Sequence, residues 1–168
     1  MVTKPEIIRK KKSYYCFKVN QMKKILSSVF VLIIQTLLTA QTQQVRFNHL
    51  AILVKDLKVS RNFYEQVIGL DTIPEPFHDG KHKWYNIGAG TSIHVIEGAD
   101  SKKEYSKGNH ICLSVSSVGA FMQTLLKNKI DFGDYEGKKG TFTTRPDGIK
   151  QIWFQDPDGY WIEINDAK

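Results

Sequence analysis

The sequence predicts an α+β fold in which two copies of a βαβββ module face each other across a partly closed, barrel-like cleft. Two internal repeats predict the duplication. Residues 48–54 read NHLAILV, and residues 109–115, 61 positions later, read NHICLSV. Residues 92–97 read SIHVIE, and residues 161–166, 69 positions later, read WIEIND. Because both copies carry a His or Glu near each end, a pseudo-two-fold site is expected where the copies meet.

The first copy, residues 45–97, has the pattern of a strand, a helix and three more strands. Residues 45–54 are rich in β-branched and aliphatic side chains, as in a strand. Asp56 can cap a helix that runs to Ile68, and Gly69 supplies its end. The later strands, separated by glycine-containing turns, are expected over residues 71–74, 83–87 and 92–97.

The second copy, residues 109–166, repeats this order after the polar linker 98–108. Residues 110–115 predict a strand, and Ser117 can cap a helix whose apolar residues follow helical spacing. The remaining strands are expected over residues 132–135, 149–155 and 161–165. Residues 41–168 are enough for one domain with a core and too few for two.

The positive charge of the chain lies in its first 40 residues. The formal net charge is +7, and residues 1–40 hold eight of the 24 basic residues and one of the 17 acidic ones. The remainder is therefore neutral, and a nucleic-acid surface on the folded domain is not indicated.

Residues 1–40 predict an N-terminal extension with a signal peptide, and export to the periplasm or beyond. Met22, followed by two lysines, is the expected true start. Residues 25–38 form an apolar segment of fourteen residues, and cleavage is expected after Ala40. Such a segment is shorter than the about twenty residues that span a bilayer, although an uncleaved anchor is the alternative. After cleavage no membrane association is expected, and Cys112 is the only thiol left, so no internal disulfide forms.

Strand alternation assigns the polar candidates to one face. Even-numbered residues of 50–54 are apolar, so His49 points the other way. By the same parity His94, His110 and Glu163 oppose the apolar residues of their own strands. Since the apolar faces must cover the helices, these four residues share the opposite, concave face.

Further polar and aromatic side chains share the concave face. They are two indoles, three amides and a thiol: Trp84, Trp153, Asn86, Gln151, Gln155 and Cys112. Such a composition is typical of a cleft for a small-molecule substrate and not of a core. The alternative is that the indoles only fill the barrel and that Cys112 only packs. His78 and His82 flank a turn, where exposure to solvent is expected.

These motifs resemble the vicinal oxygen chelate superfamily, which includes glyoxalase I, fosfomycin-thiol transferases, methylmalonyl-CoA epimerase, extradiol dioxygenases and bleomycin-binding proteins. The resemblance covers nearly all of residues 45–166. It rests on NHL at residues 48–50, on NHI at residues 109–111 and, most distinctively, on FQDPDGYWIE at residues 154–163. Because this scaffold hosts many chemistries, the resemblance specifies the fold more closely than the reaction.

The resemblance implies one divalent metal ion (Zn, Ni, Mn or Fe) held by His49, His110 and Glu163. The resemblance gives His94 the position of a fourth metal ligand. The alternative is that His94 contacts the substrate. Imidazole and carboxylate ligands suit these ions and leave positions open for a bidentate oxygen substrate. Glyoxalase I carries a carboxylate where this chain has His94, so Glu163 is the expected catalytic base and His94 a second one.

The leading expectation is a homodimeric lyase or isomerase of the glyoxalase type that acts on a small substrate with vicinal oxygens. A non-catalytic, drug-sequestering protein and an Fe(II) ring-cleaving dioxygenase are the alternatives. Bleomycin-binding relatives generally lack the metal ligands, and extradiol dioxygenases usually have a longer chain. The potassium-binding loop of fosfomycin-thiol transferases is not found. The sequence leaves open whether the two copies pair within one chain or across a dimer.

Overall fold

The computed structural model describes residues 18–19, 21–28, 30 and 44–168. Residues 47–168 form one compact unit, separate from residues 1–46. The predicted cleavage after Ala40, and most of the predicted signal peptide, lie outside the described residues. In the part of the chain that is described, no helix has the length and apolar character needed to cross a membrane.

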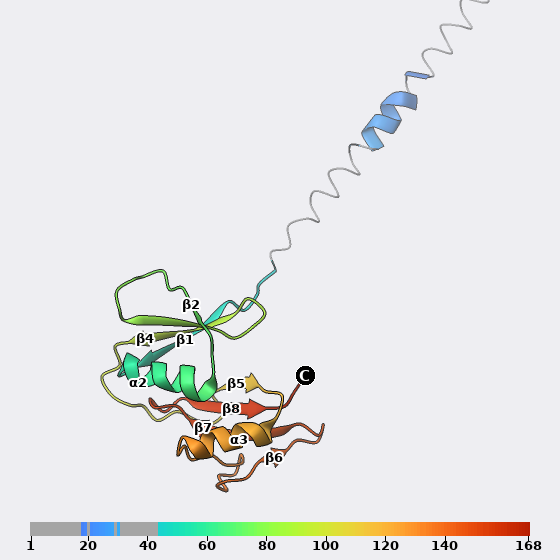
Figure 1. Cartoon of the computed structure of the whole chain (residues 1–168). Helices are drawn as coiled ribbons and strands as arrows, with labels where there is room; N and C mark the ends of the chain where they lie inside the picture. Colours follow the sequence, from blue (N-terminus) through green and yellow to red (C-terminus); the bar gives the residue numbers. More distant parts are fainter. Residues whose placement is uncertain (1–17, 20, 29, 31–43) are drawn as a thin grey trace, which may run out of the picture. The chain divides into compact units, whose positions relative to one another are not determined.

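Two four-stranded mixed sheets make up residues 47–168, one from each copy of the repeat (Figure 1). The sheet of module one (residues 45–97) has the order β1-β4-β3-β2, and the sheet of module two (residues 109–166) has the equivalent order β5-β8-β7-β6. The strands are β1 His49–Val54, β2 Thr72–Ile73, β3 His82–Asn86, β4 Ser92–Glu97, β5 His110–Ser114, β6 Thr143–Thr144, β7 Lys150–Gln155 and β8 Trp161–Asn165. The predicted α+β fold of two related modules is confirmed, although the sheets do not close into a barrel.

The helices begin where the sequence predicts. The helix α2, Leu57–Asn62, continues directly as the π-helical segment η2, Phe63–Ile68. Asp56 Oδ1 accepts a hydrogen bond from Val59 N (3.0 Å), and Gly69 ends the helix with φ of 81°. In module two, Ser117 Oγ accepts from Ala120 N (3.2 Å) at the start of α3, Val118–Lys127. The π turn was not expected from the pattern.

One hydrophobic core joins the two modules. Phe154 of β7 lies between Phe63 of η2 and Phe121 of α3, with ring centroids 6.3 and 6.0 Å away. The predicted apolar faces of β1, β4, β7 and β8 are buried in this core. Helix α2 contacts β3 and β4, and α3 contacts β7 (Figure 1). The opposite faces, which carry the polar candidates, are therefore left free of helices.

Two predicted strands are corrected. The first strand begins at His49 and not at residue 45, because its partner β4 begins at Ser92, which pairs with His49. The strand expected over residues 132–135 is only a bridge at Gly133, and β6 forms the sheet edge instead. Asp134 Oδ1 accepts from Lys138 N (2.8 Å), which turns the chain and stops a strand from forming.

A polar turn ties module two to module one. The Tyr64 hydroxyl donates to Asp156 Oδ2 (2.8 Å), Ser60 Oγ donates to Asp158 Oδ2 (3.0 Å), and Lys55 N donates to Asp158 Oδ1 (2.7 Å). Both carboxylates are buried. Burial raises the pKa of Asp156 above its ordinary value of 3.8, although the hydrogen bond from Tyr64 opposes the shift. The sequence predicted only a turn here, whereas these two aspartates form an inter-module clamp.

Candidate metal centre

His49 and His94 come together on the concave face of module one. Their strands β1 and β4 are parallel neighbours, and their ring centroids are 6.1 Å apart. His49 Nδ1 lies 2.7 Å from Asn48 Oδ1, a hydrogen-bond acceptor, so Nδ1 carries the proton and Nε2 keeps its lone pair. His94 Nε2 is buried and has no hydrogen-bond partner among the described residues.

His94 is enclosed by aromatic rings. Phe77 stacks on one side with centroids 5.7 Å apart and planes at 8°, and Trp84 stacks on the other at 4.2 Å and 19°. Burial, and then the neighbouring His82 and His49, lower the pKa of His94 from its ordinary value of 6.5. The imidazole is therefore neutral at neutral pH, which is the form that binds a metal or accepts a proton.

His82 belongs to this cluster, and the expectation that it lies in solvent is wrong. Its side chain is only 16% exposed, and its ring lies 5.0 Å from His94 and 4.3 Å from Phe77. Its Nδ1 is also buried without a hydrogen-bond partner in the described chain. Strand parity would have found it, because His82 shares a face with Trp84. His78, in contrast, is exposed as predicted, with 81% of its side chain accessible.

His110 and Glu163 form the pair in module two. His110 Nε2 lies 3.3 Å from Glu163 Oε2. His110 Nδ1 donates to the carbonyl oxygen of Lys107 (3.1 Å), so Nε2 is the ring nitrogen that faces Glu163. Asn165 Nδ2 donates to Glu163 Oε1 (2.9 Å), which leaves Oε2 as the oxygen that faces His110.

Trp153 and Cys112 lie beside this second pair. The Trp153 ring meets His110 edge to face at 4.5 Å, and its buried Nε1 has no partner within the described residues. Cys112 is the strand partner of Glu163. Burial, and then the nearby Glu163, raise the pKa of the Cys112 thiol to about 11. The thiol is therefore protonated at neutral pH and is a wall of the site and not a nucleophile.

The three predicted amides have different positions. Gln151 is the strand partner of Asn165, beside the module-two pair. Gln155 Nε2 donates to a backbone carbonyl of the following turn (2.9 Å). Asn86 Oδ1 accepts from Gly88 N (3.0 Å), and Asn86 lines a separate cavity of about 230 Å³ between the modules. The structure therefore brings Asn86 to neither pair.

The four predicted ligands form two pairs and not one cluster. Among the residues that the structure describes, no three His, Cys, Asp or Glu side chains are grouped so that they could hold a metal ion. The sequence left open whether the copies combine their ligands within one chain or across a dimer, and within the described part of one chain the ligands stand as two pairs. The physical reason is that the modules contact each other through the shared core and the inter-module clamp, which lie on the apolar side of the sheets.

Each pair nevertheless has the donor chemistry of a divalent-metal site. The pairs offer imidazole nitrogens with lone pairs and one carboxylate oxygen, which suit Zn, Ni, Mn or Fe. Hydrogen bonds orient three of these ligands, as is usual for groups that lie just outside a metal's ligands. The partners are Asn48, the Lys107 carbonyl and Asn165. The unpartnered, buried Nε2 of His94 is consistent with a nitrogen that gains its partner on ligand binding. The donor chemistry of these residues therefore fits a divalent metal ion.

Comparisons with known proteins identify the family of the chain. A family model described as the Glyoxalase/Bleomycin resistance protein/Dioxygenase superfamily matches residues 46–164. The chain is 30% identical over 125 residues to the uncharacterized protein YwbC of Bacillus subtilis (strain 168), which covers 71% of this chain and 95% of YwbC. It is 26% identical over 160 residues to a lactoylglutathione lyase of Pseudomonas aeruginosa, with 76% of this chain and 86% of the lyase covered.

Solved structures share the fold. The crystal structure of a glyoxalase/dioxygenase from Nostoc punctiforme superimposes with a TM-score of 0.61 at 22% identity, covering 77% of this chain and 96% of that chain. At this identity the likeness concerns the fold alone. The family match spans both modules and both pairs of candidate ligands, and enzymes of this family typically use a divalent metal. The chain therefore belongs to the glyoxalase, bleomycin resistance and dioxygenase superfamily, as its motifs predict.

Proposed function

We propose that the protein is a divalent-metal-dependent lyase or isomerase of the glyoxalase type that acts on a small substrate with oxygens on adjacent carbons. The observation that carries this proposal is the pair of His110 and Glu163. One hydrogen bond holds His110 by Nδ1 and another holds Glu163 by Oε1, so that Nε2 and Oε2 face the site. The similarity to a lactoylglutathione lyase over 76% of the chain supports the reaction class.

The proposed active site takes its ligands from two copies of the chain. His49 and His94 of one copy would meet His110 and Glu163 of the other, because each copy holds two ligands per module and no larger group in its described part. A two-fold symmetric dimer makes this exchange reciprocal and yields two equal sites. The proposal therefore includes a homodimer with one divalent ion per site.

Glu163 is the proposed catalytic base. Its Oε1 accepts the hydrogen bond from Asn165, so Oε2 is the oxygen that would leave the metal, remove a proton from one carbon and return it to the neighbouring one. His94, neutral because its pKa is lowered, is a second group able to accept that proton. The bound metal would polarise the substrate oxygens and stabilise the negative charge that develops on them. Trp84 and Trp153 would shape the pocket and exclude water.

Metal analysis of the purified full chain tests this proposal. We expect about one equivalent of Zn, Ni, Mn or Fe per chain in the wild type, and a loss of the metal in His110→Ala. His78→Ala is the matched control, because His78 is exposed on a loop and belongs to neither pair. Equal metal content in His110→Ala, or no metal in any of the three after reloading, would contradict the proposal.

A second candidate function is sequestration of a flat compound without catalysis. It is favoured by the aromatic stack of Phe77, His94 and Trp84 on module one. Binding of aromatic compounds that is the same with and without a chelator would support it. The third candidate, an Fe(II) dioxygenase, uses the same ligand chemistry, and oxygen uptake after anaerobic iron loading would identify it.

A further inference from the structure

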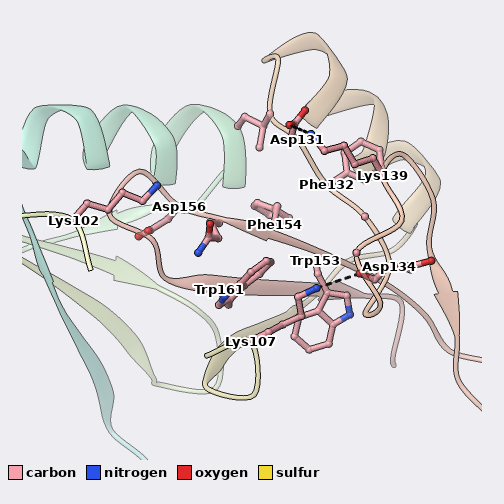
Figure 2. A pocket seen from close by; sticks show the side chains of 14 residues that line it. Lys102, Lys107, Asp131, Phe132, Asp134, Lys139, Trp153, Phe154, Asp156 and Trp161 are labelled. Carbon is pink, nitrogen blue, oxygen red and sulfur yellow. Dashed lines mark hydrogen bonds and ion pairs between the residues drawn. The ribbon is translucent and has the colours of Figure 1, made fainter. Parts of the chain in front are cut away.

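A cavity of about 300 Å³ lies next to the His110 and Glu163 pair. It is enclosed by residues 130–139, by the linker residues Lys102 and Lys107, and by the adjoining ends of β7 and β8 (Figure 2). Trp153 lines this cavity and also contacts His110 edge to face. The cavity and the candidate metal pair therefore share a wall.

Aromatic rings form much of the cavity wall. Trp153, Trp161, Phe132 and Phe154 all line it, as Figure 2 shows. Trp161 is the strand partner of His110, and its Nε1 donates to the carbonyl oxygen of Tyr105 (2.9 Å). Trp153, Phe132 and Phe154 are nearly fully buried, whereas Trp161 is partly exposed, so the Trp161 ring, held by its strand and this hydrogen bond, offers the surface for a planar group.

Lys107 brings a positive charge to this wall without a negative partner. Its Nζ lies 4.6 Å from the centroid of the Trp161 ring and donates to the carbonyl oxygens of Tyr135 (2.8 Å) and Asp134 (3.5 Å). It forms no ion pair with any carboxylate in the described chain. Lys102 also lines the cavity, and in the same part of the chain its ammonium has no hydrogen-bond or ion-pair partner.

The carboxylates of the lining are already engaged. Asp131 pairs with Lys139 (2.6 Å), Asp134 accepts from Lys138 N (2.8 Å), and Asp156 belongs to the inter-module clamp. Lys102 and Lys107 have no carboxylate partner among the described residues, so an anionic, acceptor-rich group is the partner that suits them.

The same lysine connects the cavity to the candidate catalytic pair. The backbone carbonyl of Lys107 accepts from His110 Nδ1 (3.1 Å), while its side chain extends over Trp161. Lys107 therefore contacts both the wall of the cavity and the imidazole of the candidate pair.

We propose that this cavity binds the acidic, aromatic end of a substrate whose other end reacts at His110 and Glu163. The carboxylate would pair with Lys102 and Lys107, and the ring would pack on the partly exposed Trp161, beside the buried Trp153. The position of the reacting end rests on the proposed function, whereas binding of the acidic end does not require a metal. The volume is at the lower limit of small-molecule pockets, which is roughly 300 Å³, and suits a bicyclic acid.

Calorimetric titration of the chelator-treated full chain with 2-naphthoate tests the proposal, with 2-naphthamide as the neutral probe of the same shape. We expect the acid to bind about tenfold more tightly than the amide. Lys102→Gln and Lys107→Gln should each remove most of this preference, and Lys107→Arg should keep it. Lys58→Gln is the control, since Lys58 is an exposed lysine of α2 outside the cavity. Equal affinity for the two probes, or an equal loss in the control, would overturn the proposal.

The indole N–H resonances report where the probe binds. The chain has three tryptophans, so each signal can be assigned by substitution. We expect 2-naphthoate to shift the signals of Trp153 and Trp161 and to leave that of Trp84 in place. A shift of Trp84 alone would assign the acid to module one and overturn the proposal.

The metal content of the protein before chelator treatment separates this inference from the proposed function. If the protein binds a metal through His110 but does not prefer the acid, the cavity proposal fails and the proposed function stands. If the acid binds as expected but no metal does, the proposed function fails, and the cavity remains a site for aromatic acids.

Discussion

Single hydrogen bonds decide which atom of each candidate ligand faces the site. His49 and His110 both use Nδ1 for an oxygen acceptor, which leaves Nε2 on each ring. Glu163 uses Oε1 for Asn165, which leaves Oε2. Such outer-shell contacts fix tautomer and direction before any ligand arrives. Replacement of one candidate ligand by an isosteric residue therefore tests its chemistry with little effect on packing.

Glu163→Gln should abolish turnover while the fold is kept. The amide has the shape of the carboxylate but can neither take a proton nor offer a negatively charged oxygen to a metal, so we expect a rate loss of about 10²-fold or more. Steady-state kinetics, metal content and a thermal unfolding curve measure the three quantities. Glu136→Gln is the control, because Glu136 is an exposed loop residue. Unchanged activity in Glu163→Gln would remove Glu163 from the mechanism.

The loop between β2 and β3 decides whether His94 is accessible. The carboxylates of this loop accept hydrogen bonds from its own backbone. Glu75 accepts from Phe77 N (2.8 Å) and His78 N (2.7 Å), and Asp79 accepts from Lys81 N (2.9 Å). The Phe77 ring is therefore the part of this loop that covers His94. Trp84, in contrast, is fixed between two strands.

Phe77→Ala should expose His94. Removing the ring uncovers one face of the imidazole, so we expect diethyl pyrocarbonate to modify His94 several-fold faster in the metal-free variant. Mass spectrometry of the modified peptides measures the rate at each histidine. Phe142→Ala is the control, because Phe142 is an exposed ring of module two, whereas the rings that contact His94 all belong to module one. An unchanged rate at His94 would show that Trp84 and the sheet alone protect it.

The inter-module clamp should give the fold a measurable pH dependence. The pKa of Asp156 is raised in the folded state, so folding takes up a proton between pH 3.8 and the raised value. The contribution of Asp156 to stability is therefore greatest below pH 3.8 and falls as the pH rises through that window. Asp156→Asn lacks this titration and keeps an acceptor for the backbone N–H groups of Asp158 and Tyr160.

Urea unfolding at a series of pH values measures this effect. The stability of Asp156→Asn relative to the wild type should increase as the pH rises through the window and then level off. Asp131→Asn, at the surface, is the control. A relative stability that falls with rising pH would mean that the charged carboxylate, with its hydrogen bond from Tyr64, stabilises the fold.

In the proposed homodimer, the His49 and His94 pair of one copy is expected to meet the His110 and Glu163 pair of the other. A shared site makes a complementation test possible, because His49→Ala and Glu163→Ala would damage opposite halves. Each variant alone should lose its metal. After unfolding and refolding as an equimolar mixture, half the dimers would be mixed and each would have one intact site, so about one quarter of the wild-type metal content should return. No recovery would favour ligands drawn from a single chain.

Expression of the whole chain in an exporting host tests the predicted leader. Processing after Ala40 should yield a mature protein that begins at Gln41, as N-terminal sequencing would show. If the protein keeps the apolar segment and is found in the membrane fraction, the segment is an anchor and not a cleaved signal peptide.

Local patterns predicted much of the fold. The caps at Asp56 and Ser117, the end at Gly69 and the face of each strand are decided by short-range rules, because helical capping and strand alternation involve residues close in sequence. The same rules put the four candidate ligands opposite the apolar faces. They failed at residues 132–135, where the hydrogen bond of the Asp134 side chain closes a turn.

The sequence by itself determined the duplicated α+β modules, the family and the chemical types of the candidate ligands. Only the tertiary structure decided which ligands meet, that His82 joins His94, and that the two aspartates of a predicted turn tie the modules together. Capping and strand parity act over a few residues of the chain. The relative placement of the modules instead depends on burying Phe154 and two carboxylates against residues about 90 to 100 positions away, which no local pattern specifies.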